Sequence, residues 1–208
     1  MFIKSQIKSA TLTTSLLLAT LCLLNIVQGS TTLGKCPEVQ LRSTLDTALY
    51  KGRWYEVQRG DLFQEDDQIC VTADYTLQYD RSLRIKNRAR YPDGSFGGIM
   101  GRVVCRQAEC RAKFDQFFIP AGKYMVLDTD YNTYAIVYTC AQYLFGVFKQ
   151  ENVWVLSRST TAFDATTQTN ILNTIQTRIP NYDITKLKTT PQGGTCVYDQ
   201  EPLQPVSP

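Results

Sequence analysis

The stretch ICVTADYTLQY, residues 69–79, decides the fold of this chain. Apolar side chains occupy alternate positions, at Val71, Ala73, Tyr75, Leu77 and Tyr79, and polar side chains lie between them. A period of two predicts a β-strand with one face toward a core and the other toward solvent. The stretch therefore predicts a sheet that is buried on one side.

The same alternation continues on both sides of this stretch. Turn residues such as Asp80-Arg81-Ser82 and Pro92-Asp93-Gly94 interrupt it at about ten-residue intervals. The expected strands are 52–59, 69–79, 83–91, 98–106, 110–118, 123–128, 133–141 and 152–157. Eight strands with short connections are typical of an all-β, up-and-down antiparallel barrel, whose closure leaves no free sheet edge.

The period changes once, after the last expected strand. Between Asp164 and Arg178, apolar residues recur at the spacing of one face of a helix. Asp164 is a suitable N-cap, and Pro180 cannot continue the helix. One helix cannot form a second domain by itself. We therefore expect a single domain over residues 30–200, with the helix packed outside the barrel.

The two ends of the chain are expected to lie outside this domain. Residues 1–29 combine basic Lys4 and Lys8 with an apolar run, which is typical of a secretory signal peptide. The alternative is a membrane anchor, but the run is short of the ~20 apolar residues that a span needs. After the helix, residues 183–189 can add a short strand, and the tail 201–208 is expected to be flexible. We expect a secreted, extracellular protein without an integral membrane span.

Cysteine usage agrees with export. After the signal segment there remain Cys36, Cys70, Cys105, Cys110, Cys140 and Cys196, and an even number in an exported chain indicates disulfides. Their spacing alone leaves the pairing open. Cys105 and Cys110 can also be read as half of a zinc site, but no second close pair exists and the chain has no histidine. No metal and no cofactor are expected.

The missing histidine also argues against catalysis. Hydrolytic triads, cysteine–histidine dyads and most catalytic metal sites need an imidazole, so no enzyme activity is expected. The net charge of +3 comes without a run of Lys or Arg long enough for nucleic acid. The basic residues of 81–90 alternate along a strand, which favours a solvated barrel face over a phosphate- or membrane-binding patch. Contact with a membrane surface or a receptor stays open.

The expected inward face of the barrel contains small as well as aromatic side chains. An eight-stranded barrel is just wide enough to hold one small ligand. Inward alanines at Ala73, Ala89, Ala112 and Ala135 indicate unfilled space, and the aromatic residues suit a flat, mostly apolar guest. The alternative is a barrel filled by its own side chains.

Three short segments resemble the signatures of the lipocalin family. They are Gly52-x-Trp54 in the first strand, Asp128-Thr129-Asp130-Tyr131 before the seventh, and Arg158 at the end of the eighth. The resemblance covers residues 36–196 and is greatest to apolipoprotein D-like and bilin-binding lipocalins. It implies that Trp54 forms the barrel floor with Arg158 across its ring. It also implies the disulfides Cys36–Cys140 and Cys70–Cys196, which leaves Cys105 to pair with Cys110.

The resemblance further implies where a ligand binds. Carried over position by position, the contacts fall on Tyr75, Asn87 and Trp154, with Asn87 as the hydrogen-bonding group. Leu156, Phe114, Ala135 and Val137 share inward positions on the same or neighbouring strands. The implied function is transport of a small hydrophobic ligand: a lipid, fatty acid, sterol, retinoid or bilin. Two alternatives are an isomerase-type lipocalin with a free cysteine thiolate and a protein-binding or scavenger lipocalin with a filled calyx.

Overall fold

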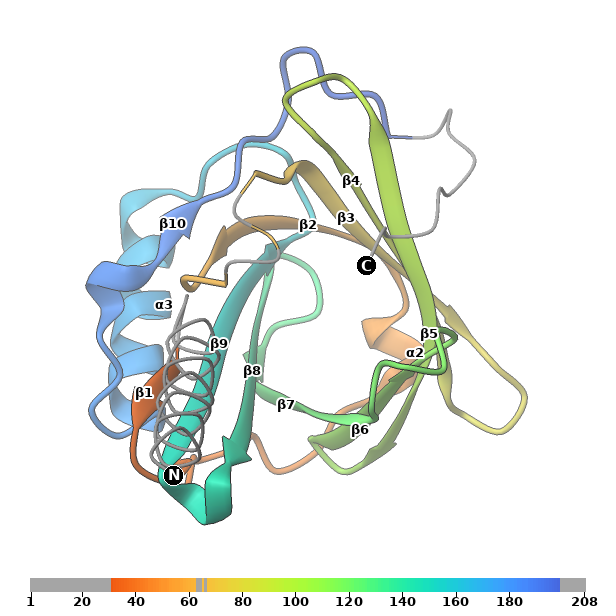
Figure 1. The fold of residues 1–208 in the computed structure, drawn as a ribbon. Coiled ribbons are helices and arrows are strands. Elements are labelled where there is room, and N and C mark those ends of the chain that lie inside the picture. Colours follow the sequence, from red (N-terminus) through yellow and green to blue (C-terminus); the bar gives the residue numbers. More distant parts are fainter. Residues whose placement is uncertain (1–30, 63–64, 66, 199–208) are drawn as a thin grey trace, which may run out of the picture.

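The strands form a closed ring. The computed structural model describes residues 31–62, 65 and 67–198, so the predicted signal peptide and tail lie outside the described residues. Within that part of the chain, the ring in Figure 1 consists of β2 (Gly52–Arg59), β3 (Ile69–Leu77), β4 (Leu83–Arg90), β5 (Phe96–Arg106), β6 (Glu109–Phe114), β7 (Gly122–Thr129), β8 (Tyr134–Tyr143) and β9 (Phe148–Ser157). Each strand is antiparallel to the next, and β9 pairs with β2. The predicted eight-stranded antiparallel barrel is confirmed.

The alternating strand directions give the barrel two different ends. β2, β4, β6 and β8 run from the end that holds Trp54, which we call the closed end, toward the open end. Short elements flank the ring: β1 (Thr31–Leu33) on β9, α2 (Thr47–Tyr50) before β2, η2 (Leu144–Gly146), η3 (Ile184–Lys186), and β10 (Lys188–Thr189) on β2. β10 lies within the stretch where a short strand was expected.

One longer helix, α3 (Ala165–Arg178), lies outside the ring of strands (Figure 1). The Asp164 carboxylate accepts a hydrogen bond from the N–H of Thr167, and the helix stops just before Pro180, as predicted. Ile171, Ile175 and Ile179 are buried against outward side chains of β7, β8 and β9. This second apolar cluster, separate from the barrel interior, fastens α3 to the barrel.

β3 departs from strict alternation at both ends. Its register with β4 shifts between Ile69 and Thr72, and Cys70 has a φ of 56°. Thr72 follows this bulge, pairs with Tyr55 and Arg88, and is buried on the outward face that it shares with Asp74. The strand ends at Leu77, and Tyr79 is fully exposed in the turn that follows. The prediction that Tyr79 shares the buried face is therefore wrong.

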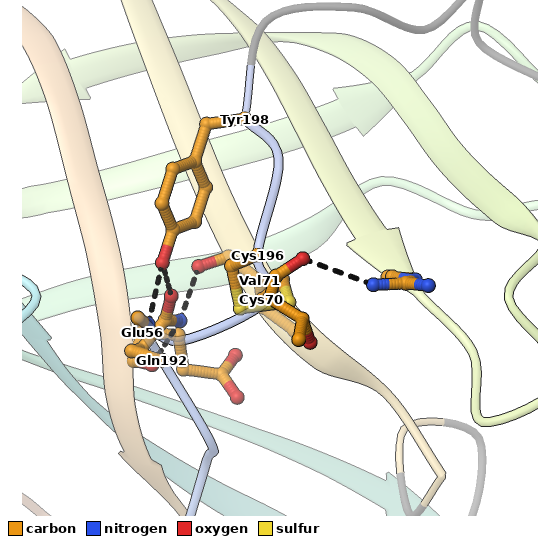
Figure 2. The surroundings of a disulfide bond; sticks show 9 residues. Glu56, Cys70, Val71, Gln192, Cys196 and Tyr198 are labelled. Atoms are coloured by element: carbon orange, nitrogen blue, oxygen red, sulfur yellow. Dashed lines mark hydrogen bonds between the residues drawn. A yellow bond between two sulfur atoms is a disulfide. The ribbon is translucent and has the colours of Figure 1, made fainter.

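The described residues contain three disulfides, of which two tie flanking segments to the barrel and one joins the neighbouring strands β5 and β6. They are Cys36–Cys140, Cys70–Cys196 and Cys105–Cys110, the pairs that the resemblance implied. Figure 2 shows Cys70–Cys196, which ties the last described residues to the start of β3. Beside it the Gln192 side chain donates hydrogen bonds to the carbonyls of Glu56 and Val71, both 2.8 Å long. The C-terminal segment is therefore fastened to the barrel wall.

Candidate ligand-binding cavity

A tryptophan and an arginine seal the closed end of the barrel. Trp54 is fully buried, and the guanidinium of Arg158 lies 3.6 Å from the centre of its ring. Arg158 also donates hydrogen bonds to the carbonyls of Arg53 (2.7 Å) and Lys51 (2.9 Å). Gly52 has a φ of 99°, and a Cβ there would lie 3.2 Å from Nη1 of Arg158, so both conformation and space favour glycine.

The aspartates of the second signature hold the turn beside this floor. Asp130 accepts a hydrogen bond from the N–H of Tyr134 (3.0 Å), and Asp128 accepts one from the Tyr134 hydroxyl (2.7 Å). Tyr131 has a φ of 68°, which directs its carbonyl to Nε of Arg158 at 3.0 Å. The three signature segments therefore meet in one place and have a structural role.

Above the floor lies a cavity of about 510 Å³. Ligand pockets in proteins usually have volumes of roughly 300–1,000 Å³ and mostly apolar walls. Ala73, Ala89 and Ala112 line this cavity, and their small side chains leave its space open. Ala135 is different: it is fully buried in the core with Trp54, nearer the closed end. The barrel is therefore not filled by its own side chains.

The cavity brings together most of the residues predicted to bind a ligand. Tyr75, Asn87, Phe114, Val137, Trp154 and Leu156 all line it, whereas Ala135 does not. The buried Oδ1 of Asn87 has no hydrogen-bond partner among the described residues. An unpaired polar atom in an apolar wall is costly unless a ligand or water satisfies it. Direct contact of these residues with a ligand stays a prediction.

Three tyrosines form a neutral polar cluster at the lower end of the cavity. The hydroxyl of Tyr124 lies 2.8 Å from that of Tyr50 and 2.7 Å from that of Tyr75. Tyr75 and Tyr124 line the cavity, and Tyr50, from α2, is fully buried below them. Burial raises the pKa of all three hydroxyls, so they stay protonated at neutral pH. The cluster places hydrogen-bonding groups in the barrel without placing charge there.

A second polar cluster lies on the wall formed by β2 and β9. Arg59 donates a 2.7 Å hydrogen bond to the carboxylate of Glu56, and both side chains are almost completely buried. Glu65 lines the cavity and accepts a 2.9 Å hydrogen bond from Nε1 of Trp154. Burial and the nearby charge of Glu56 raise the pKa of Glu65 to about 8. Burial also raises the pKa of Glu56, against the charge of Arg59.

Several polar residues of this wall are absent from the predicted set. Alternation from Trp54 places Glu56 inside the barrel, so that signal was available in the sequence. Arg59 has the opposite parity and reaches the face of Trp154 because the register between β2 and β9 shifts between Glu56 and Gln58. Glu65 lies between β2 and β3, outside any strand, so no periodicity in the sequence could predict that its side chain points toward the cavity.

The closed barrel, the stacked floor and the cavity define a lipocalin. The family model of the lipocalin-like domain matches residues 45–192, which is more than half of the chain. The protein belongs to this family.

Relatives and solved structures agree with this assignment. The chain is 36% identical to apolipoprotein D of Rattus norvegicus over 149 residues, 69% of this chain and 78% of that protein. It is 25% identical to the Lazarillo protein of Schistocerca americana, with 68% of each chain covered. The fold is similar to that of insecticyanin from the tobacco hornworm Manduca sexta, with a TM-score of 0.70 and 23% identity over 81% of this chain and 93% of that one.

Other kinds of site find no support in the described part of the chain. Residues 31–62, 65 and 67–198 contain no group of three or more His, Cys, Asp or Glu side chains that could hold a metal ion. The cysteines in these ranges are all disulfide-bonded, so they offer neither zinc ligands nor a free thiolate.

No helix in the same ranges is long and apolar enough to cross a membrane. Arg84 and Arg88, from the basic strand, pair with Asp115 and Asp74.

Proposed function

We propose that this protein is a secreted lipocalin that binds and carries one small hydrophobic molecule in its barrel, without catalysing a reaction. The observation that carries this proposal is the cavity of about 510 Å³ with a mostly apolar lining above a sealed floor. Transfer of apolar surface from water into such a cavity supplies roughly 25 cal/mol per Å². Fatty acids, sterols, retinoids and bilins all meet this description.

The proposed contacts follow from the lining of the cavity. Trp154, Leu156, Phe114 and Val137 provide apolar surface on the wall of the barrel. Tyr75 and Asn87 add polar atoms, of which the Asn87 oxygen has no partner among the described residues. Ala135 supports this wall from the core below. The disulfide-bonded cysteines and the signal-like residues 1–29 support export.

Filling the cavity is expected to abolish binding. Ala112→Phe places a ring in the cavity, so ligands that quench Trp154 fluorescence in the wild type should bind at least about tenfold more weakly, a change of about 1.4 kcal/mol or more. The measurement is saturable quenching by a panel of one retinoid, one fatty acid, one sterol and one bilin.

Ala162→Phe is the matched control, because Ala162 is exposed in the segment before α3 and does not line the cavity. This variant should bind like the wild type. If no member of the panel quenches the wild type, or if both variants bind normally, the carrier function is wrong. A lipocalin that acts by binding other proteins would then be the better account.

A further inference from the structure

The wall of the cavity near the open end carries more acid than base. Glu56 is already satisfied, since its carboxylate accepts hydrogen bonds from Arg59 (2.7 Å) and from the Thr190 hydroxyl (2.6 Å). Glu65 adds a second carboxyl group close enough to Glu56 to be affected by its charge. One guanidinium therefore faces two carboxyl groups in a largely apolar setting. Such a cluster becomes neutral when Glu65 keeps a proton.

The remaining cations of the cavity wall are placed elsewhere. Arg88 donates a 2.8 Å hydrogen bond to Asp74 and another to the Tyr198 carbonyl (3.2 Å). Lys123 is exposed at the beginning of β7, at the open end. Neither side chain offsets the acidic cluster of Glu56 and Glu65 from inside the barrel. A carboxylate that enters this part of the cavity therefore finds, among the described residues, no cation that is not already balanced by an acid.

Beside this cluster lies an asparagine whose hydrogen-bonding groups are unused. Asn152 is 1% exposed, lines the cavity, and comes two residues before Trp154 on the same face of β9. Within the part of the chain that the structure describes, neither its Oδ1 nor its Nδ2 has a hydrogen-bond partner. Buried polar atoms without partners are rare in folded proteins, and here they indicate the place of a ligand's polar end.

We propose that the cavity selects apolar ligands that end in an uncharged hydroxyl group, bound by Asn152 beside Glu65, over ligands that end in a carboxylate. A hydroxyl both donates and accepts, so it can satisfy Oδ1 and Nδ2 of Asn152 together with a neighbouring group. A carboxylate only accepts, and here it would be buried without a counter-cation, near the negative charge of Glu56. This inference rests on the proposed carrier function and adds the chemistry of the ligand.

Two pairs of probes that differ only in the head group test this preference: retinol against retinoic acid, and hexadecanol against palmitic acid. At pH 7 each alcohol should bind at least about tenfold more tightly than its acid, because the buried carboxylate loses its hydration without gaining a cation as partner. Asn152→Leu, which keeps the branched shape but removes the polar atoms, should weaken binding of the alcohols by about tenfold and leave that of the acids unchanged. Above pH 8, where Glu65 of the wild type is ionised, Glu65→Gln should bind the acids more tightly than the wild type does.

A measurement without ligand tests the state of Glu65. Its pKa is about 8 in the folded protein and near 4.5 in the unfolded chain. Between these values the folded state holds a proton that the unfolded state has lost, so rising pH shifts the equilibrium toward unfolding, by up to about tenfold per pH unit. In Glu65→Gln this contribution is absent, so its stability should fall less between pH 5 and 8 than that of the wild type.

The outcomes separate this inference from the proposed function. If alcohols and acids bind equally, if the acids bind more tightly, or if Asn152→Leu has no effect, the preference is wrong while the carrier function stands. A pH dependence of stability that is identical in the wild type and Glu65→Gln also contradicts it. If no probe of either pair and no member of the wider panel binds, the carrier function fails and the preference fails with it.

Discussion

Replacing Trp54 with alanine is expected to lower the free energy of unfolding by about 3–5 kcal/mol, as large-to-small changes of aromatic residues in protein cores do. Trp54 is fully buried, and its ring contacts Arg158 on one side and Tyr50, with ring centres 5.3 Å apart, on another. The variant also loses the hydrogen bond from Nε1 of Trp54 to the Tyr50 carbonyl (2.9 Å). Urea denaturation followed by circular dichroism measures the loss.

The matched control is the other tryptophan of the chain. Trp154→Ala makes the same change at a position that borders the cavity, so less packing is removed and a smaller loss is expected. An unchanged stability of Trp54→Ala, or equal losses in the two variants, would mean that Trp54 is not the floor of the barrel.

Removing the Cys70–Cys196 disulfide is expected to have an effect of similar size. The bond spans 126 residues, and in the chain-entropy model a loop of that length contributes about 5 kcal/mol. The double variant Cys70→Ser/Cys196→Ser also frees the C-terminal segment that Gln192 fastens to β2 and β3. Thermal unfolding of the purified variant, with the other two disulfides intact, measures the change.

The Cys105–Cys110 bond provides the comparison, because it joins facing residues of β5 and β6 across only 5 positions. The same model assigns it about 2 kcal/mol, so Cys105→Ser/Cys110→Ser should be clearly the more stable of the two double variants. If Cys105→Ser/Cys110→Ser were the less stable of the two, the stabilisation would not come from closing the long loop between Cys70 and Cys196.

The fold could be predicted because its pattern is local and repeated. Alternating side chains and frequent turns define the strands, and Asp164 and Pro180 delimit α3. Departures occur where the pairing of strands, rather than the sequence pattern, decides which way a side chain points. The bulge in β2, for example, brings Arg59 to the face of Trp154.

The cavity could be predicted only in part. Trp154 and Leu156 follow from strand parity, whereas the contact between Trp154 and Glu65 joins residues 89 positions apart, one of them between two strands. The charge balance of the wall depends on that contact and on the hydrogen bond from Thr190 to the buried Glu56, both of which arise only in the folded chain. Local periodicity carries no information about either.

Native mass spectrometry of the protein secreted by eukaryotic cells tests the central claim most directly. The wild type should carry the mass of one small apolar molecule, which organic extraction releases and identifies, and Ala112→Phe from the same cells should be free of it. A wild type that is secreted without such a molecule, and that takes up no member of the ligand panel when mixed with it, would contradict the account of the barrel as a ligand carrier.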